Sequence, residues 1–258
     1  MSNKVAQLLE DYGKRYDRRF LSSDPIYFVH QYKDPRDQEV VALVSALLAF
    51  GNAKAIHGSV KKVLQLFGES PYQFVSSANL EKIRSSFQSL GHRWVRGEDI
   101  YFLCVVLRKI FDQHDSLKSF FLKNYDQDVD GAEILLNRFS QTAKSLAPPN
   151  AISRGFQYFF PAPKDGSPCK RLNLFLRWMV RPRDGIDLGL WPEISPSKLM
   201  IPLDVHVTQF AKKWKISRRK NPSWKMVEEV THFLRSLDPE DPIKFDFAIC
   251  HYGMEIGW

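Results

Sequence analysis

The chain has 258 residues, of which 44% are hydrophobic and 26% are charged, and its formal net charge is +8. This composition is typical of a globular protein that buries a substantial core, and it excludes an intrinsically disordered chain. Three scattered cysteines without CxxC spacing argue against a disulfide framework, a zinc site of the usual kind and a four-cysteine iron–sulfur cluster.

Apolar residues recur mainly at helical spacing along the chain, and strand-like alternation is nearly absent, so the sequence predicts an all-α fold. Residues 40–50 are apolar on almost every side, which indicates a central helix wrapped by others. The expected helices cover residues 3–20, 35–50, 53–67, 70–76, 80–87, 96–114, 117–124, 131–146, 168–180, 205–214, 223–236 and 242–252.

Proline and glycine gather in residues 144–166, which predicts a joint between two helical lobes. Residues 35–160 are expected to form one lobe. Residues 1–34 with residues 161–258 are expected to form the second lobe, which carries a hairpin-like turn and the candidate active site.

Neither the apolar stretches nor the N-terminal residues are typical of a membrane-bound or secreted protein. The longest apolar stretch, residues 40–50, is too short to cross a bilayer, and the first twenty residues mix acids with bases, unlike a secretion signal. We therefore expect a cytoplasmic protein that does not bind membranes.

Residues 167–181, SPCKRLNLFLRWMVR, contain the first candidate catalytic residue. Ser167 is expected to cap a helix and Pro168 to occupy its first position, which places Lys170 in the first turn. The positive end of the helix favours the neutral amine that a nucleophile needs. Farther along this helix, Arg177 and Arg181 are expected on a side that meets a ligand.

Residues 201–207, IPLDVHV, contain the second candidate. Asp204 follows a proline and precedes an apolar-periodic run, which predicts an N-cap whose carboxylate can also face outward. Such a carboxylate can accept a proton from an amine and stabilise positive charge on a sugar. We expect the two helix starts at Lys170 and Asp204 to face one cleft.

Basic residues are concentrated around these candidates. Residues 164–220 contain 13 Lys or Arg against 5 Asp or Glu, which equals the whole excess of 8 positive charges. For residues 212–220 (KKWKISRRK) alone a solvated face is the favoured interpretation, but the clustering with the candidate residues favours binding of a polyanion.

The hairpin-like turn, the helix that begins with Lys170 and the later Pro-Leu-Asp-Val-His with Asp204 together resemble the helix-hairpin-helix DNA glycosylase superfamily. The spacer of 34 positions from Lys170 to Asp204 is similar to that of the archaeal 8-oxoguanine glycosylase branch and longer than that of the endonuclease III branch. The chain is also similar to a related bacterial family of conserved hypothetical proteins. The resemblance covers about residues 35–252.

The resemblance implies two helical lobes with a hairpin-bearing cleft between them. It implies that Lys170 attacks the sugar of a flipped oxidised purine such as 8-oxoguanine, that Asp204 assists, and that the Schiff base permits strand cleavage by β-elimination. The expected partner is damaged duplex DNA, bound by a monomer. No metal-ligand spacing and no glycine-rich nucleotide loop occurs, so neither a metal nor a cofactor is predicted.

Other residues are expected near the substrate. Asn52 lies where many relatives have a turn that wedges into DNA. Trp178 can stack on a flipped base, although aromatic residues at helical spacing, here with Trp191 and Phe210, more often fill a core. His206 can touch a phosphate, with a packed histidine as the alternative. The expected substrate or DNA contacts are Asn52, Ser167, Arg171, Arg177, Arg181, His206 and Trp178.

The turn itself departs from the superfamily. The usual core is Leu-Pro-Gly-x-Gly, whose bare N–H groups hold a phosphate, whereas residues 160–166 read FPAPKDG. This difference favours an alternative function, a non-catalytic DNA- or RNA-binding module in which Lys170 only contacts phosphate.

Overall fold

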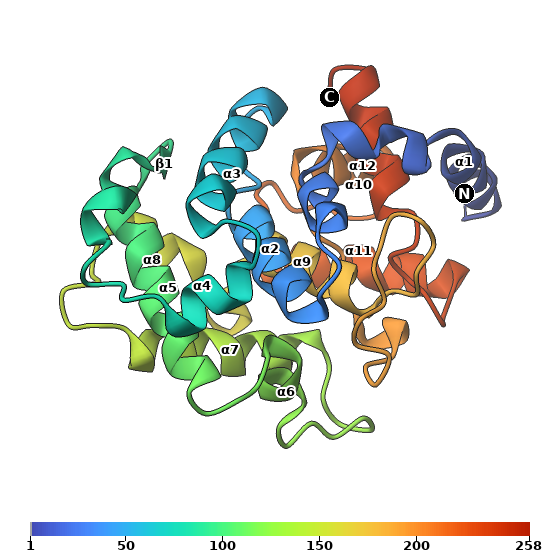
Figure 1. The fold of residues 1–258 in the computed structure, drawn as a ribbon. Helices are drawn as coiled ribbons and strands as arrows, with labels where there is room; N and C mark the ends of the chain where they lie inside the picture. The colour runs from blue at the N-terminus through green and yellow to red at the C-terminus, as the bar shows by residue number, and fades with distance from the viewer. Residues whose placement is uncertain (1) are drawn as a thin grey trace. The chain divides into compact units, whose positions relative to one another are not determined.

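The computed structural model describes residues 2–258 and shows an all-α fold (Figure 1). The chain divides into two compact units. The central unit comprises Ser23–Tyr125 and Leu135–Pro161, and the C-terminal unit comprises the residues up to Ser22, Asp126–Ile134 and Ala162–Trp258. Compared with the lobes expected from the sequence, residues 23–34 and Pro161 belong to the central unit instead, and residues 126–134 belong to the C-terminal unit.

Helix α2 is the core of the central unit. Asp34 caps it by accepting a hydrogen bond from Arg36 N at 2.8 Å, and the residues from Asp37 to Leu47 are all buried. The two buried acids of α2 have structural roles, because Glu39 accepts from Leu117 N at 2.8 Å and Asp37 accepts from Tyr72 N at 2.8 Å. These carboxylates satisfy N–H groups at the starts of two other helices, which explains why acids lie inside the unit.

The remaining elements of the central unit are further helices and one small sheet. Strands β1 (Gly91–His92) and β2 (Val95–Arg96) pair antiparallel, with Gly91 opposite Arg96. The helices are η2 (Pro25–Gln31), α2 (Pro35–Leu47), α3 (Ala53–Phe67), α4 (Pro71–Ser77), η3 (Arg84–Ser89), α5 (Gly97–Phe111), α6 (Leu117–Leu122) and α8 (Arg154–Phe159), together with most of α7 (Ala132–Leu146).

The C-terminal unit contains the candidate residues. Helix α12 packs against α10 and α1 (Figure 1). Tyr12 of α1 stacks on Tyr252 of α12 with ring centroids 4.0 Å apart. Its helices are α1 (Ser2–Arg15), η1 (Arg18–Ser23), η4 (Pro163–Asp165), α9 (Lys170–Val180), η5 (Pro196–Lys198), α10 (Val205–Lys213), α11 (Trp224–Leu237) and α12 (Asp246–Glu255).

Several predicted helices differ from the structure at their ends. Helix α1 stops at Arg15 rather than at residue 20, α12 begins at Asp246 rather than at residue 242, and residues 84–89 form a 3-10 helix. Helix α8, in the proline-rich joint, was not expected. No helix among residues 2–258 combines the length and the apolar character needed to span a membrane.

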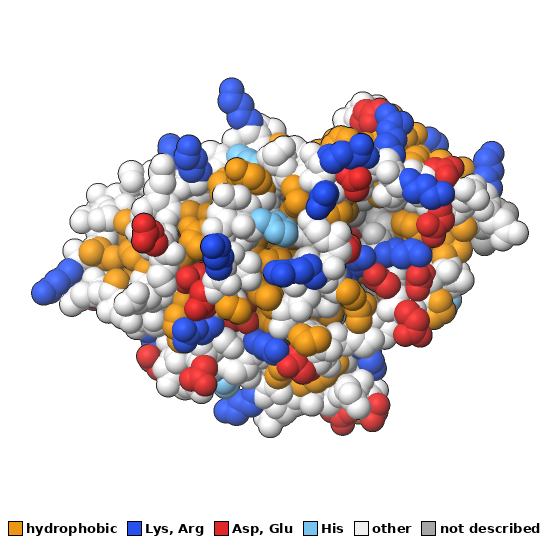
Figure 2. All heavy atoms as spheres, turned by 45° about the vertical axis from the view of Figure 1, so that its right-hand side comes forward, with side chains coloured by type: hydrophobic (Ala, Val, Ile, Leu, Met, Phe, Trp, Pro, Cys, Tyr) orange, Lys and Arg blue, Asp and Glu red, His pale blue; other side chains and the backbone are white. Residues whose placement is uncertain are grey.

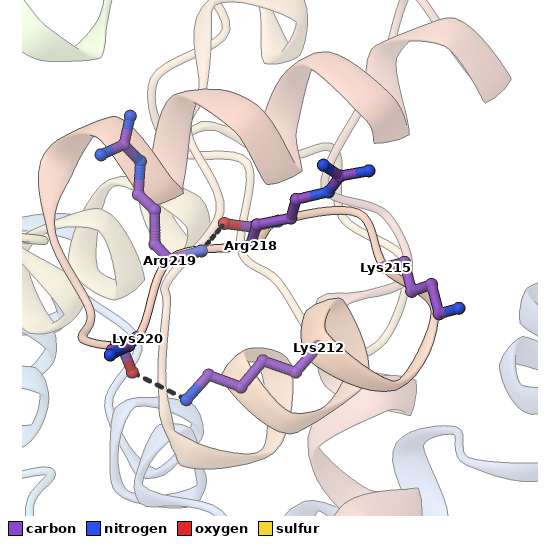
Figure 3. Close-up of a pocket in the computed structure, with 6 residues that line it drawn as sticks. Lys212, Lys215, Arg218, Arg219 and Lys220 are labelled. Carbon is purple, nitrogen blue, oxygen red and sulfur yellow. Dashed lines mark hydrogen bonds between the residues drawn. The ribbon is translucent and has the colours of Figure 1, made fainter.

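Charges of both signs are mixed on the face of the molecule drawn in Figure 2. On the face drawn in Figure 2, Lys and Arg side chains lie singly or in short groups with Asp and Glu among them. The densest basic segment of the sequence, residues 212–220, lines a pocket of its own (Figure 3).

Candidate active site

Lys170 is the first residue of α9. The helix begins after Cys169, whose backbone is left-handed with φ of 47°. Ser167 Oγ accepts a hydrogen bond from Cys169 N at 3.3 Å, and Asn173 Nδ2 donates to Pro168 O at 3.2 Å. The predicted place of Lys170 in the first turn is confirmed, but Ser167 is not the N-cap, because the chain makes one more tight turn before the helix starts.

The turn before α9 is held against the C-terminal unit. Residues Pro163–Asp165 form one 3-10 turn, and Gly166 follows with φ of 75°, a left-handed conformation that glycine adopts without strain. Gly166 N donates to Pro163 O at 2.8 Å, and Gly166 O accepts from Trp224 N at 2.9 Å. The start of α9 is thereby fixed relative to the start of α11.

Asp204 is the N-cap of α10, as predicted. Its Oδ1 accepts from Val207 N at 2.8 Å, and its backbone O accepts from Thr208 N at 2.9 Å. The second carboxylate oxygen, Oδ2, accepts a hydrogen bond from Cys250 Sγ at 3.0 Å. Both oxygens of Asp204 therefore have donors, which fixes the direction of the carboxylate.

Cys250 is the residue that the sequence analysis missed. Burial raises the pKa of its thiol well above the usual value, and the charges of Asp204 and Asp246 raise it further, whereas Lys170 lowers it. The thiol thus keeps its proton and donates it to Asp204. Asp204 is bonded to this thiol, and the charge of Lys170 reaches it, so both candidate residues belong to the surroundings of Cys250.

A close approach of two helices holds this arrangement in place. Cys250 and Gly253 lie one helical turn apart on α12, and a Cβ on Gly253 would lie 2.6 Å from the Cβ of His206 in α10. Real Cβ atoms do not approach so closely, so α10 and α12 can meet here only because residue 253 is glycine. The signal in the sequence was the spacing of Asp246, Cys250 and Gly253, which places all three on one helical face.

Beneath the site, α9 is buried on all sides. Arg177 is 2% exposed and donates to Asp246 Oδ2 at 2.7 Å and to Asp187 Oδ2 at 3.2 Å. Arg181 is 7% exposed, pairs with Asp187 and binds Asp241 at 2.9 Å. The interpretation of Arg177 and Arg181 as ligand contacts is therefore wrong, because carboxylates inside the unit already neutralise them.

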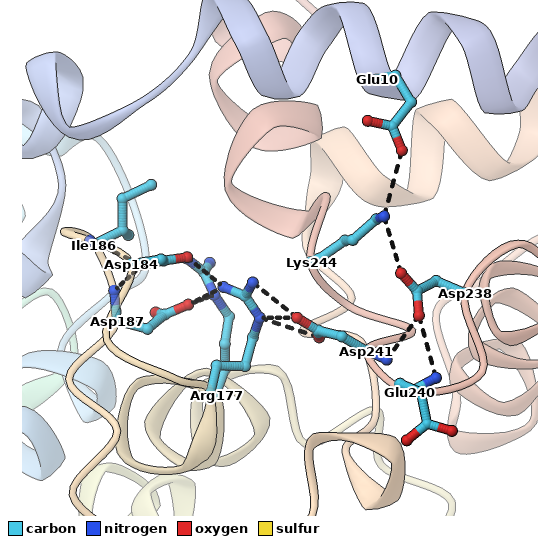
Figure 4. Close-up of polar contacts among 10 residues, drawn as sticks. Glu10, Arg177, Asp184, Ile186, Asp187, Asp238, Glu240, Asp241 and Lys244 are labelled. Atoms are coloured by element: carbon cyan, nitrogen blue, oxygen red, sulfur yellow. Dashed lines mark hydrogen bonds and ion pairs between the residues drawn. The ribbon is translucent and has the colours of Figure 1, made fainter.

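The surrounding polar contacts extend this buried network. Figure 4 shows Asp184 and Asp187 beside Arg177, and Lys244 between Glu10 and Asp238. Lys244 lies 3.3 Å from Glu10 and 2.9 Å from Asp238. These ion pairs connect α1, α9 and the segment before α12 within the C-terminal unit.

Three further residues that were predicted to contact the substrate or DNA are part of the folded framework instead. Arg171 is 5% exposed, and Trp178 is 0% exposed, as are Trp191 and Phe210. Trp178 therefore belongs to the core and does not present a stacking surface. Asn52 lies in the central unit, where its side chain caps α3 by accepting from Ala55 N at 2.8 Å.

A family model described as "Protein of unknown function (DUF2400)" matches residues 24–255. The chain belongs to the DUF2400 family. No curated protein and no solved structure matches the chain. Lys170, Asp204 and Cys250 all lie inside the matched region of this DUF2400 protein.

One group of side chains in the site has donor atoms suited to a metal ion. Single donor atoms of Asp204, His206 and Cys250 lie within 4.8 Å of one another. Carboxylate, imidazole and thiolate are the ligands that zinc prefers. His206 Nδ1 is buried and has no hydrogen-bond partner among residues 2–258. The expected contact of His206 with a phosphate stays a prediction.

The arrangement can therefore support two kinds of chemistry. An amine at a helix start beside an oriented carboxylate suits nucleophilic attack with proton transfer. The carboxylate, imidazole and thiol of the same site could instead hold a cation. Both use Asp204, so a cation there would compete with proton transfer.

Proposed function

We propose that this DUF2400 protein is a DNA glycosylase with abasic-site lyase activity, which excises an oxidised purine such as 8-oxoguanine from duplex DNA. The observation that supports the proposal is that Lys170 and Asp204, 34 positions apart, both stand at helix starts and both act on the Cys250 thiol, Asp204 through a hydrogen bond and Lys170 through its charge. The resemblance of these two segments to the helix-hairpin-helix glycosylases supplies the substrate class.

In this reaction Lys170 Nζ forms a bond to C1′ of the flipped nucleotide while the bond from C1′ to the base breaks. The amine loses a proton, and the departing base gains one. Opening of the sugar then gives a Schiff base between Lys170 and C1′. Loss of a proton from C2′ and cleavage of the C3′–O bond release the downstream strand with a 5′ phosphate, and water hydrolyses the imine to free the lysine and leave an unsaturated aldehyde on the upstream strand.

Asp204 has two roles in this scheme. Its carboxylate accepts the proton of the Lys170 amine, and its negative charge stabilises the positive sugar as the base departs. The donors Val207 N–H and Cys250 S–H hold the carboxylate in one direction, so little reorganisation is needed during the reaction.

The three cysteines of the chain, Cys104, Cys169 and Cys250, are free thiols. Free thiols are typical of a reducing compartment. We therefore place the proposed enzyme in the cytoplasm, where it acts on DNA as a monomer.

Borohydride trapping tests the proposal. The purified protein is incubated with duplexes that contain 8-oxoguanine or an abasic site, and borohydride reduces any Schiff base to a stable adduct. We expect an adduct with the wild-type protein, none with Lys170→Gln, and slower base release with unchanged DNA binding for Asp204→Asn. Lys225→Gln, an exposed lysine on α11, is the matched control and should trap like the wild type.

Two outcomes would contradict the proposal. Adduct formation by Lys170→Gln at the wild-type rate would exclude Lys170 as the nucleophile. Because the scheme uses no metal, a chelator should leave adduct formation unchanged. Loss of adduct formation on addition of a chelator would instead identify Asp204, His206 and Cys250 as a metal centre.

The alternative function is a non-catalytic DNA- or RNA-binding module. The turn at Pro163–Asp165 favours it, because Ala162 and Lys164 stand where the superfamily core Leu-Pro-Gly-x-Gly has its two glycines, and Pro163 between them has no N–H to donate. Intact DNA or RNA binding without any adduct on either duplex would support this module.

A further inference from the structure

The segment after α10 folds into a basic pocket at the surface. Residues 212–220, which we call the basic loop, enclose about 590 Å³ (Figure 3). The lining residues are Lys212, Lys215, Ser217, Arg218, Arg219 and Lys220. All the lining residues except Ser217 are cations and are exposed, so the pocket presents positive charge to solvent from several directions.

The shape of the basic loop is fixed by the way α10 ends. Ile216 N donates to Ala211 O at 2.8 Å and Lys215 N donates to Lys212 O at 3.1 Å, the two bonds of a Schellman motif. Lys215 has φ of 54°, the left-handed conformation for which glycine is the usual residue at this position. A lysine is strained there, so folding alone does not explain the choice of side chain.

Further hydrogen bonds hold the basic loop in place. Lys212 Nζ donates to Lys220 O at 2.8 Å, which closes the ring of residues. Ser217 Oγ donates to Glu229 at 2.5 Å and Arg219 Nε donates to Glu229 at 2.9 Å. One carboxylate on α11 therefore anchors the loop.

Most of the positive charge of the basic loop is not neutralised. Among residues 2–258, Lys215, Arg218 and Lys220 form no ion pair. Lys212, in the last turn of α10, also interacts favourably with the negative end of the helix. Lys215, Arg218 and Lys220 lie beyond the end of α10, so stabilisation of this helix does not explain why these positions are cationic. Their concentration in one pocket suits a ligand with several negative charges.

The basic loop and the candidate active site share one rigid element. Asp204 caps the start of α10, and Lys212 lies in its last turn. Eight residues of α-helix span about 12 Å along the axis. The two sites are therefore held at a fixed separation of this order, which is short enough for one DNA strand to reach both.

We propose that the basic loop is a phosphate-binding site for one DNA strand, on the same strand as the nucleotide at Lys170 and Asp204 and close to it. This inference rests on the proposed function for the identity of the ligand. Lys215, Arg218 and Lys220 contact the phosphates, and Glu229 keeps the loop in its binding shape. Because the contacts are to the backbone, the loop contributes affinity without reading sequence.

The test measures how DNA affinity depends on salt, with an abasic-site duplex and the full-length protein. Lys215→Gly/Arg218→Gln/Lys220→Gln should weaken binding about tenfold or more at low salt and lower the slope of log affinity against log salt by about 2 to 3. Glycine is chosen at position 215 because it fits the backbone there. Lys4→Gln/Lys14→Gln/Lys225→Gln removes the same charge from exposed helical positions and should change both quantities much less.

Equal salt slopes in the two triple variants would overturn the inference. Loss of single-stranded RNA binding with duplex DNA binding unchanged would overturn the assignment to DNA. A failure of the proposed lyase activity can be distinguished from a failure of the phosphate site. If the wild type binds DNA with the expected salt slope but gives no borohydride adduct, the phosphate site is supported and the lyase activity is excluded. Trapping at saturating DNA should be retained in the loop variant, since Lys170 and Asp204 are unchanged.

Discussion

Two basic regions of the C-terminal unit contain similar residues in different surroundings. In α9, Arg177 and Arg181 are buried and bonded to aspartates, whereas in the basic loop Lys215 and Arg218 are exposed and form no ion pair within residues 2–258. A charge that loses its partner inside a protein costs several kcal/mol, whereas an exposed charge costs very little. The first region therefore holds the fold around the site, and the second is available to a ligand.

The largest contrast is expected from removing one cation of each region. Arg177→Met should lower the free energy of unfolding by about 3 to 5 kcal/mol, because Asp246 stays buried without its partner. Arg218→Gln makes the same change of charge in the basic loop and should alter stability by less than about 0.5 kcal/mol. Urea denaturation measures both, and similar losses in the two variants would remove the distinction between the regions.

The pH dependence of stability sharpens the description of the buried region. Burial, opposed by Arg177 and reinforced by Asp204, raises the pKa of Asp246 from 3.8 to about 7. Between these values the folded protein retains a proton that the unfolded chain has released, so this group makes stability fall as pH rises, by at most about 1.4 kcal/mol per pH unit.

Asp246→Asn should abolish that contribution. The free energy of unfolding of the variant minus that of the wild type should increase as pH rises from about 4 to about 7. Urea denaturation at several pH values in this range measures the difference. A difference that does not change with pH would show that Asp246 is ionised throughout.

The contact between α10 and α12 is expected to give a smaller effect. Gly253→Ala places a methyl group 2.6 Å from the Cβ of His206, so the helices must separate and stability should fall by about 1 to 3 kcal/mol. Gly58→Ala is the matched control, since a Cβ at this helical position of α3 meets nothing within 4 Å and should stabilise the protein by about 0.5 to 1 kcal/mol. Thermal unfolding compares the two, and a harmless Gly253→Ala would show that the contact is loose.

The parts of the site that were predictable from the sequence are local. Lys170 at a helix start and Asp204 as an N-cap follow from a few neighbouring residues, because capping and proline preferences act within one turn. The all-α class likewise follows from the periodicity of apolar residues. The predicted N-cap of α9, Ser167, lies two residues before the observed N-cap, Cys169. The left-handed backbone of Cys169 could not be predicted, because this conformation is not favoured for cysteine.

The parts that were not predictable depend on contacts between distant residues. Cys250 meets Asp204 across 46 positions, and Arg177 meets Asp246 across 69. An arginine at helical spacing looks the same whether it faces solvent or a buried aspartate, so Arg177 and Arg181 were interpreted as ligand contacts. Taken alone, the basic loop was interpreted as a solvated face, and only its clustering with the other basic residues favoured polyanion binding, because the hydrogen bonds from the loop to Glu229 on α11 are not visible in the sequence.

The smallest expected effect separates backbone strain from charge in the basic loop. Lys215→Gly should raise the free energy of unfolding by about 0.5 to 1 kcal/mol, because glycine adopts the left-handed conformation without strain. Lys215→Ala removes the same charge but keeps the strain, so its stability should match the wild type. If Lys215 contacts phosphate, both variants should lose the same DNA affinity, measured by titration at low salt. If Lys215→Gly gains stability without losing DNA affinity, the strained lysine has no part in DNA binding. If it gains stability and loses affinity, the strained backbone lowers the stability of the protein but holds a positive charge where it contacts phosphate.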